Sequence, residues 1–164
     1  MKKSMQAGVL GTAGVILILA LLHSGRAREA TATPASSDSL MGVFEGRTPC
    51  GQIAVEFTGF PSQNCEKIKW QLTLYRDSSS GRPTTFLYEG TRTTRRGTWT
   101  TRRGSASDPN AWIYQLAPVP SGKPLFLLSV EDDVLLLLDP QLSVVVGDAS
   151  WSYALNRTDR QSGR

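Results

Sequence analysis

The sequence has little histidine, cysteine and methionine, the side chains on which much enzyme and metal chemistry depends. Its one histidine is His23, and beyond Ala32 it has one methionine, Met41, and two cysteines, Cys50 and Cys65. Nucleophilic catalysis commonly pairs the nucleophile with a histidine base, and copper sites use cysteine, methionine or histidine. We therefore expect a protein that is not an enzyme, with no catalytic residue, no metal site and no cofactor.

Acidic residues are present, but not in a pattern suited to acid–base catalysis. Glu131, Asp132 and Asp133 are adjacent where a tight turn is expected, whereas paired catalytic carboxylates converge from different elements across a cleft. We interpret these three residues as a solvated hairpin tip. The segment Asp108-Pro109-Asn110 is ordinary turn sequence.

The excess of positive charge is small outside the N-terminal segment. The chain has a formal net charge of +4, and residues 1–32 contribute four basic residues and one acidic residue. The rest of the sequence therefore has a net charge of about +1. A nearly neutral domain gives no global reason to expect a nucleic-acid partner.

A long apolar run, residues 7–22, follows the basic residues Lys2 and Lys3. It is slightly longer than a usual signal-peptide core and shorter than the roughly 20 residues of a membrane-spanning helix. Small-residue cleavage patterns follow at residues 25–27 and 30–32. We expect residues 1–32 to be a signal peptide or a signal anchor and residues 33–39 to be a flexible linker. The expected location is the periplasm or cell envelope, with membrane contact only through an uncleaved N-terminal segment.

From Leu40 onward the pattern is that of short strands without a strong long helix. Residues 67–76 alternate well, with Ile68, Trp70, Leu72 and Leu74 on one face, which predicts a half-buried strand. Apolar spacing predicts a short helical turn within residues 52–60. The other expected strands are residues 41–47, 84–94, 97–102, 111–116, 125–130, 134–138, 142–146 and 151–156. Turns every 8–12 residues favour an all-β antiparallel meander of about eight strands, either a barrel or a sandwich. We favour the barrel, because closure removes exposed edges.

A series of weak motifs across residues 41–157 resembles the N-terminal domain of the copper-resistance lipoprotein (NlpE) family. The motifs are Gly42-x-Phe44-x-Gly46-x-x-Pro49-Cys50, Cys65-x-x-Ile68-x-x-x-Leu72-x-Leu74, Phe86-x-x-x-Gly90, Gly97-x-Trp99, Leu136-x-x-Asp139 and Tyr153-x-Leu155-Asn156. The resemblance implies a small lipocalin-like β-barrel in the bacterial envelope. This chain lacks the family's C-x-x-C spacing, since 14 residues separate its cysteines, and it has no lipid-acceptor cysteine.

The two cysteines predict a disulfide, because an exported chain with two cysteines most often pairs them. A bond between Cys50 and Cys65 would close a loop worth about 3 kcal/mol in the chain-entropy model. The alternative is a redox-active or metal-binding pair. The wide spacing does not enforce the close approach of thiols that a C-x-x-C provides.

Two sets of residues are candidates for binding. Five arginines, Arg92, Arg95, Arg96, Arg102 and Arg103, flank Trp99, which is a pattern for binding a polyanion such as a phosphorylated envelope lipid or glycan. The simpler interpretation is a solvated hairpin with Trp99 in the core. The four tryptophans Trp70, Trp99, Trp112 and Trp151 occupy expected inner faces. They either fill the barrel or line an apolar ligand pocket.

These observations define a barrel domain at residues 40–157, followed by a polar tail at residues 158–164. They lead to three functional hypotheses for the barrel domain. The first is a non-enzymatic envelope protein of NlpE-like type that binds a ligand or a protein partner, with a role in envelope stress sensing. The second is a lipocalin-like carrier of an apolar small molecule. The third and weakest is a thiol-redox or copper-handling protein.

Overall fold

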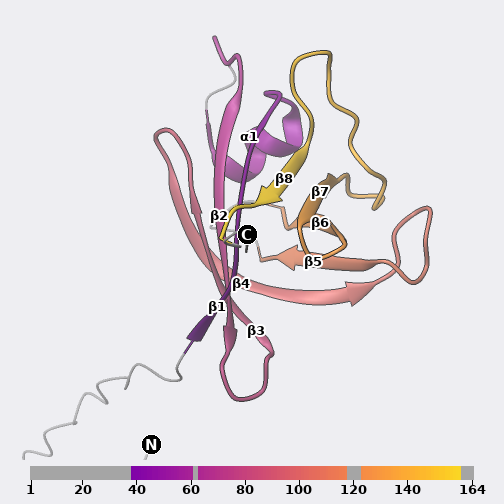
Figure 1. The fold of residues 1–164 in the computed structure, drawn as a ribbon. Coiled ribbons are helices and arrows are strands. Elements are labelled where there is room, and N and C mark those ends of the chain that lie inside the picture. Colours follow the sequence, from indigo (N-terminus) through magenta and orange to yellow (C-terminus); the bar gives the residue numbers. More distant parts are fainter. Residues whose placement is uncertain (1–37, 61–62, 118–122, 160–164) are drawn as a thin grey trace, which may run out of the picture. The chain divides into compact units, whose positions relative to one another are not determined.

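The strands follow one another in chain order around a closed barrel (Figure 1). The computed structural model describes residues 38–60, 63–117 and 123–159. Each strand pairs antiparallel with the next, and β8 pairs with β1 to close the ring. The predicted all-β antiparallel barrel of about eight strands is therefore confirmed. The elements are β1 (Asp38–Thr48), α1 (Gln52–Thr58), β2 (Ile68–Asp77), β3 (Pro83–Glu89), β4 (Thr94–Arg103), β5 (Trp112–Leu116), β6 (Leu125–Val130), β7 (Val134–Leu138) and β8 (Ala154–Arg157).

Alternation of apolar and polar residues places one face of each strand in the barrel interior. In β2, the side chains of Ile68, Trp70, Leu72 and Leu74 are all buried, as their spacing predicts. Neighbouring strands add further apolar side chains to the same core, among them Phe44, Phe86, Tyr88, Trp99, Leu116, Leu127, Leu135 and Leu155. The interior is therefore a packed hydrophobic core over much of its length.

The structure corrects several predicted strand boundaries. Strand β1 begins at Asp38, so the end of the expected linker is part of the sheet. Strand β3 ends at Glu89 rather than continuing to residue 94, because the chain turns where the Gly90 amide donates to the Thr93 carbonyl. Strand β4 consequently begins at Thr94, three residues earlier than expected.

The expected strand at residues 142–146 is wrong, since the segment makes only one isolated bridge, between Leu138 and Val144. The carboxylate of Asp139 accepts hydrogen bonds from the amides of Gln141 and Ser143 and so holds a tight turn. Leu142 has a φ of 64° within that turn. A left-handed residue at this position is incompatible with the start of a strand.

The helix α1 closes one end of the barrel, which we call the closed end (Figure 1). Its residues Ala54, Phe57 and Thr58 are buried, and this spacing of three and four is that of one helical face. The ring of Phe57 stacks on Trp70 at a centroid distance of 5.7 Å and lies 5.8 Å from the ring of Tyr88. The helical turn predicted between the cysteines is therefore confirmed, and it forms an aromatic plug.

The predicted disulfide is also confirmed. Cys50 and Cys65 are bonded, with their Cα atoms 6.0 Å apart, and they stand on either side of α1 in the sequence. The bond ties the segment that carries α1 to the start of β2.

The N-terminal predictions fall on residues that lie outside the described ranges, apart from the last residues of the linker. Within the described ranges, no helix is both long and apolar enough to cross a membrane. At the other end of the barrel domain, Thr158 and Asp159 fall in the predicted polar tail but are bonded to β1. The Thr158 amide donates to the Val43 carbonyl at 2.8 Å, and an Asp159 carboxylate oxygen accepts from the Val43 amide at 3.0 Å.

Candidate functional site

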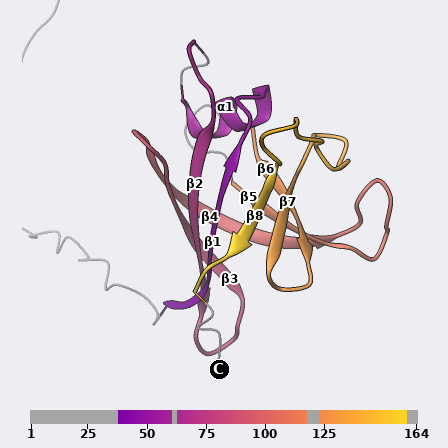
Figure 2. The same ribbon diagram turned by 45° about the horizontal axis from the view of Figure 1, so that its top comes forward.

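The end of the barrel opposite α1 is open, and we call it the mouth. Strand β1 begins there, and the β2–β3 and β6–β7 connections lie there (Figure 2). The end of β4 and the start of β5, which the β4–β5 connection joins, border the same opening. A hollow of about 280 Å³ occupies the mouth. Its lining comes from six strands and the β2–β3 and β6–β7 connections, and consists of Met41, Arg76, Gly81, Pro83, Trp99, Thr101, Trp112, Tyr114, Ser129 and Asp132.

Two buried aromatic rings form the floor of the mouth. The rings of Trp99 and Tyr114 pack with their centroids 4.9 Å apart and their planes inclined by 54°. The Trp99 indole N–H donates to the Tyr75 carbonyl at 2.8 Å, and the Ser129 hydroxyl donates to the Tyr114 hydroxyl at 3.4 Å. Because the polar groups of the floor are satisfied within the protein, its ring carbons are left to contact an apolar group.

Trp112 stands at the rim of the mouth and is 46% exposed. It is the first residue of β5 and pairs with Arg103, the last residue of β4. The Arg103 guanidinium lies 3.6 Å from the centroid of the Trp112 ring and donates to the Asn110 carbonyl. This contact places a positive charge and an amphipathic indole side by side at the entrance.

The β2–β3 connection that forms part of the mouth is held by one carboxylate. Asp77 accepts hydrogen bonds from the hydroxyl of Ser79 at 2.6 Å, from the amide of Ser80 at 2.7 Å and from the hydroxyl of Ser80 at 2.8 Å. These donors, led by the Ser79 hydroxyl, lower the pKa of Asp77 from 3.8 to about 2. The carboxylate is therefore ionised, and the loop keeps its form, at any pH near neutrality.

An ion pair beside the mouth fastens β8 and the following residues to β1. The Arg157 side chain donates to the Asp159 carboxylate at 2.8 Å and also donates to the Met41 carbonyl. This hydrogen bonding lowers the pKa of Asp159 and raises the pKa of Arg157. The pair therefore stays charged at neutral pH and fixes the backbone beside Met41, a lining residue.

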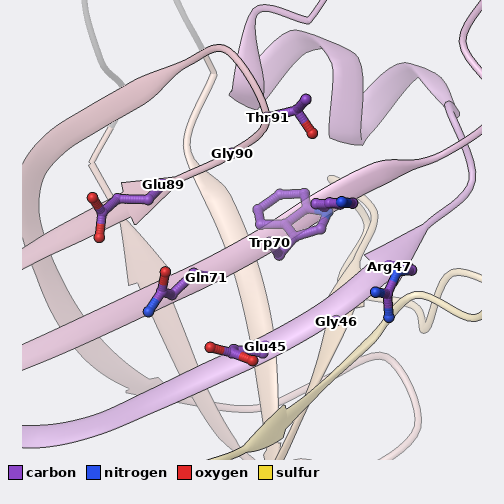
Figure 3. Close-up of a pocket in the computed structure, with 9 residues that line it drawn as sticks. Glu45, Gly46, Arg47, Trp70, Gln71, Glu89, Gly90 and Thr91 are labelled. Atoms are coloured by element: carbon purple, nitrogen blue, oxygen red, sulfur yellow. The ribbon is translucent and has the colours of Figure 1, made fainter.

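A larger hollow, of about 470 Å³, lies on the outer face of β1, β2 and β3 (Figure 3). Its lining includes the side chains of Glu45, Arg47, Lys69, Gln71 and Glu89, whose charges are of both signs. Four of these five side chains are charged and all five are exposed, so water competes for each of their interactions. We prefer the smaller mouth as the functional site, because ligand sites are usually concave and largely apolar with a few convergent polar groups.

The structure separates the four tryptophans that were expected on inner faces. Trp70 is buried at the closed end, where its indole donates to the Thr48 hydroxyl at 2.9 Å. Trp99 and Trp112 both line the hollow at the mouth. Trp151 is half-buried in the β7–β8 connection, where the Lys67 ammonium lies 4.8 Å from its ring centroid.

The five arginines flanking Trp99 are not gathered into one site. Arg92 lies in the β3–β4 connection, Arg95 and Arg96 begin β4, and Arg102 and Arg103 end it. At roughly 3.4 Å per strand residue, about 24 Å separates Arg95 from Arg102. Arg95 pairs with Tyr88 near the closed end, whereas Arg103 contacts Trp112 at the mouth.

No sequence pattern groups Met41, Arg76 and Ser129 with the aromatic residues. Met41 lies at a register shift between β1 and β2, where Leu40 pairs with Tyr75 and Gly42 pairs with Leu74. Such an irregularity leaves an extra residue in one strand, and here that residue lines the mouth. Only the register of the closed barrel brings these positions together.

Comparisons with protein-family models, with curated proteins and with solved structures found no match for this chain. The fold and the site define a closed antiparallel barrel with one end plugged by a helix and the other open to a small aromatic hollow. Within the described residues, no group of three histidine, cysteine, aspartate or glutamate side chains is placed to hold a metal ion.

Proposed function

We propose that this protein is a non-enzymatic, exported protein of the bacterial cell envelope that binds a small amphipathic molecule at the mouth of its barrel. The observation that carries the proposal is the aromatic floor of the mouth, where Trp99 and Tyr114 have satisfied polar groups and face a hollow of about 280 Å³. The apolar part of the ligand packs on these rings. Its polar part lies at the rim, near Arg76, Arg103 and Trp112.

The size of the hollow limits the ligand. Ligand pockets are commonly about 300–1,000 Å³, so the mouth suits a short acyl segment or a single ring. The plug of Phe57, Trp70 and Tyr88 fills the interior toward the closed end. A carrier that encloses a whole lipid is therefore less well supported than a protein that holds one end of an amphipathic molecule.

The export and the envelope location in this proposal rest on the basic and apolar N-terminal sequence and on the disulfide, which is typical of oxidising compartments. A role in envelope stress sensing, implied by the resemblance to the NlpE-like family, belongs to the same proposal. In that role, occupancy of the mouth would be the signal.

The binding proposal is tested by titrating the protein with decanoate and with decyl phosphate while following tryptophan fluorescence. We expect saturable binding of at least one of the two, with a change in the emission of Trp99 or Trp112. Replacing Thr101 with phenylalanine puts a ring into the mouth and should weaken binding at least tenfold.

The matched control is Thr100→Phe. Thr100 is the neighbouring residue of β4 and is exposed, and successive side chains of a strand point to opposite faces. This variant should bind like the original protein. Equal binding by the Thr101→Phe variant, or no binding of either amphiphile to the unmodified protein, would contradict the proposal.

A further inference from the structure

The mouth carries three of the large apolar side chains that are exposed in the described part of the chain. Leu40 is 48% exposed, Trp112 is 46% exposed and Val130 is 37% exposed. Leu40 lies near the start of β1, Trp112 begins β5 and Val130 ends β6. These strand ends share one end of the barrel, so the three side chains lie at the rim of the mouth, and of the three Trp112 lines the hollow itself.

The N-terminal segment joins the barrel at this same end. Strand β1 begins at Asp38, which pairs with Asp77 at the β2–β3 connection. The sequence before it contains the apolar run at residues 7–22, after Lys2 and Lys3. A chain of the length of residues 23–37 has a root-mean-square span of only about 20 Å if it behaves as a flexible linker. A barrel attached through that run therefore has its mouth as the end nearest the membrane.

The charges around the mouth do not favour a purely electrostatic partner. Basic residues at this end are Arg76, Arg82, Arg102, Arg103 and Arg157, and acidic residues are Asp38, Asp77, Asp108, Glu131, Asp132, Asp133 and Asp159. With both signs present, a strongly anionic surface would meet repulsion as well as attraction. An exposed tryptophan beside arginine, with an exposed leucine and an exposed valine at the same end of the barrel, instead fits the interfacial region of a bilayer.

We propose that the mouth end is a membrane-contacting surface, with Leu40, Trp112 and Val130 in the interfacial region of the bilayer. The hollow then opens toward the lipid, and an amphipathic ligand can enter it without crossing water. This inference rests on the exposed apolar side chains at the rim and on the position at which the N-terminal segment joins the barrel. It can be wrong even if the mouth binds a soluble amphiphile.

The test uses the full chain, with residues 1–37 retained and checked by mass spectrometry, reconstituted into phosphatidylcholine vesicles. Vesicle flotation first shows association. Tryptophan fluorescence is then compared between vesicles of ordinary lipid and vesicles of lipid brominated on the acyl chain, since bromine quenches only nearby indoles. The chain has four tryptophans, and none lies in residues 1–37.

We expect brominated lipid to quench the protein and the Trp112→Phe variant to lose more than half of that quenching. The control Trp151→Phe removes a half-buried tryptophan that lies against Lys67 in the β7–β8 connection. The Trp151→Phe variant should lose as much fluorescence to brominated lipid as the unmodified protein does. Raising the salt concentration from about 0.1 M to about 1 M should have little effect, because screening weakens exposed charge contacts and not apolar ones.

A second pair of variants tests the rim without removing a fluorophore. Val130→Glu should reduce the quenching at least twofold, whereas Val146→Glu, at an 86% exposed position in the β7–β8 connection, should not. Absence of flotation, quenching that persists in Trp112→Phe, or equal effects of the two glutamate variants would overturn the proposal.

Discussion

Asp77 shows how one half-buried residue sets the form of one edge of the mouth. Its carboxylate gathers hydrogen bonds from Ser79 and Ser80 in the β2–β3 connection, which contributes Gly81 to the lining of the mouth. Since the pKa of Asp77 is lowered in the folded state, its contribution to stability is fully present above pH 3.8. That contribution is lost as the pH falls toward about 2.

The dependence of this pKa on one hydroxyl is testable. Replacing Ser79 with alanine removes the donor with the largest effect, so we expect the pKa of Asp77 to rise from about 2 toward 3.8. Carboxyl-carbon NMR signals followed through an acid titration measure the change. Ser107→Ala, in the β4–β5 connection, is the control and should leave the Asp77 titration where it was; the same shift in both variants would exclude a direct effect of Ser79.

Single residues also show how far sequence reasoning reaches. The period of two placed Trp70 and Trp99 in the core correctly, because both lie well inside a strand. The same period put Trp112 on an inner face, yet its position as the first residue of β5 leaves it at the rim. Alternation shows on which face of the sheet a side chain lies, but not how far along the barrel axis it lies. That position along the axis decides whether an inward-facing side chain is in the core or at the mouth.

At the scale of elements, α1 acts as a plug whose stability depends on Phe57. This side chain is 3% exposed and contacts the rings of Trp70, Phe86 and Tyr88. Its burial accompanies that of Tyr88, whose pKa is raised to about 12 mainly by desolvation. The closed end is therefore an apolar aromatic cluster, in contrast to the mixed rim of the mouth.

Truncating Phe57 to alanine should cost about 3–5 kcal/mol in the free energy of unfolding, because it leaves a cavity between α1 and the barrel. Urea unfolding followed by circular dichroism measures the loss. The comparison variant Val146→Ala, at an exposed position, should change stability by no more than about 0.5 kcal/mol. A loss for Phe57→Ala as small as that of the control would mean that α1 does not plug the barrel.

The elements themselves were largely predictable, and their ends were not. Strong alternation identified β2, and turn residues marked most of the hairpins. The run Val134–Leu138 was recognisable as a strand, but Leu138 is 1% exposed on the face opposite Leu137. Its burial accompanies hydrogen bonds from the β7–β8 connection back to β7. No local pattern reveals that a distant loop returns to cover a strand.

For the whole molecule, the weak point of the ring is the seam between β1 and β8. Only two residue pairs, Phe44 with Arg157 and Glu45 with Asn156, form this ladder. The Arg157–Asp159 ion pair extends it, together with the hydrogen bond that the Thr158 amide donates to the Val43 carbonyl and the one that Asp159 accepts from the Val43 amide. Two side-chain contacts and one backbone hydrogen bond therefore reinforce the seam where the ladder is short.

We expect Asp159→Ala to destabilise the protein by about 1–3 kcal/mol, since it leaves the largely buried Arg157 side chain without its ion-pair partner and with the Met41 carbonyl as its remaining acceptor. The pKa of Asp159 is lowered by the hydrogen bond from Arg157. The contribution is therefore present above pH 3.8 and declines as the pH falls through the folded-state pKa. Chemical unfolding at pH 7 and near pH 2 should show the difference from the unmodified protein narrowing in acid.

Glu45→Ala is the matched control on the same seam, because Glu45 is exposed and pairs with Asn156. It should shift stability by no more than about 0.5 kcal/mol. An Asp159→Ala variant as stable as this control would show that the ladder alone holds the seam.

The ring of strands also sets an order of events in synthesis. Every pairing except one joins strands that are neighbours in the chain, so seven of the eight ladders can form soon after their second strand is made. Strand β1 cannot obtain its second partner until residues 154–157 have left the ribosome, more than a hundred residues later. Until then its outer edge is an unpaired template for another chain, and the β1–β8 ladder is one that can form only after the last strand has been made.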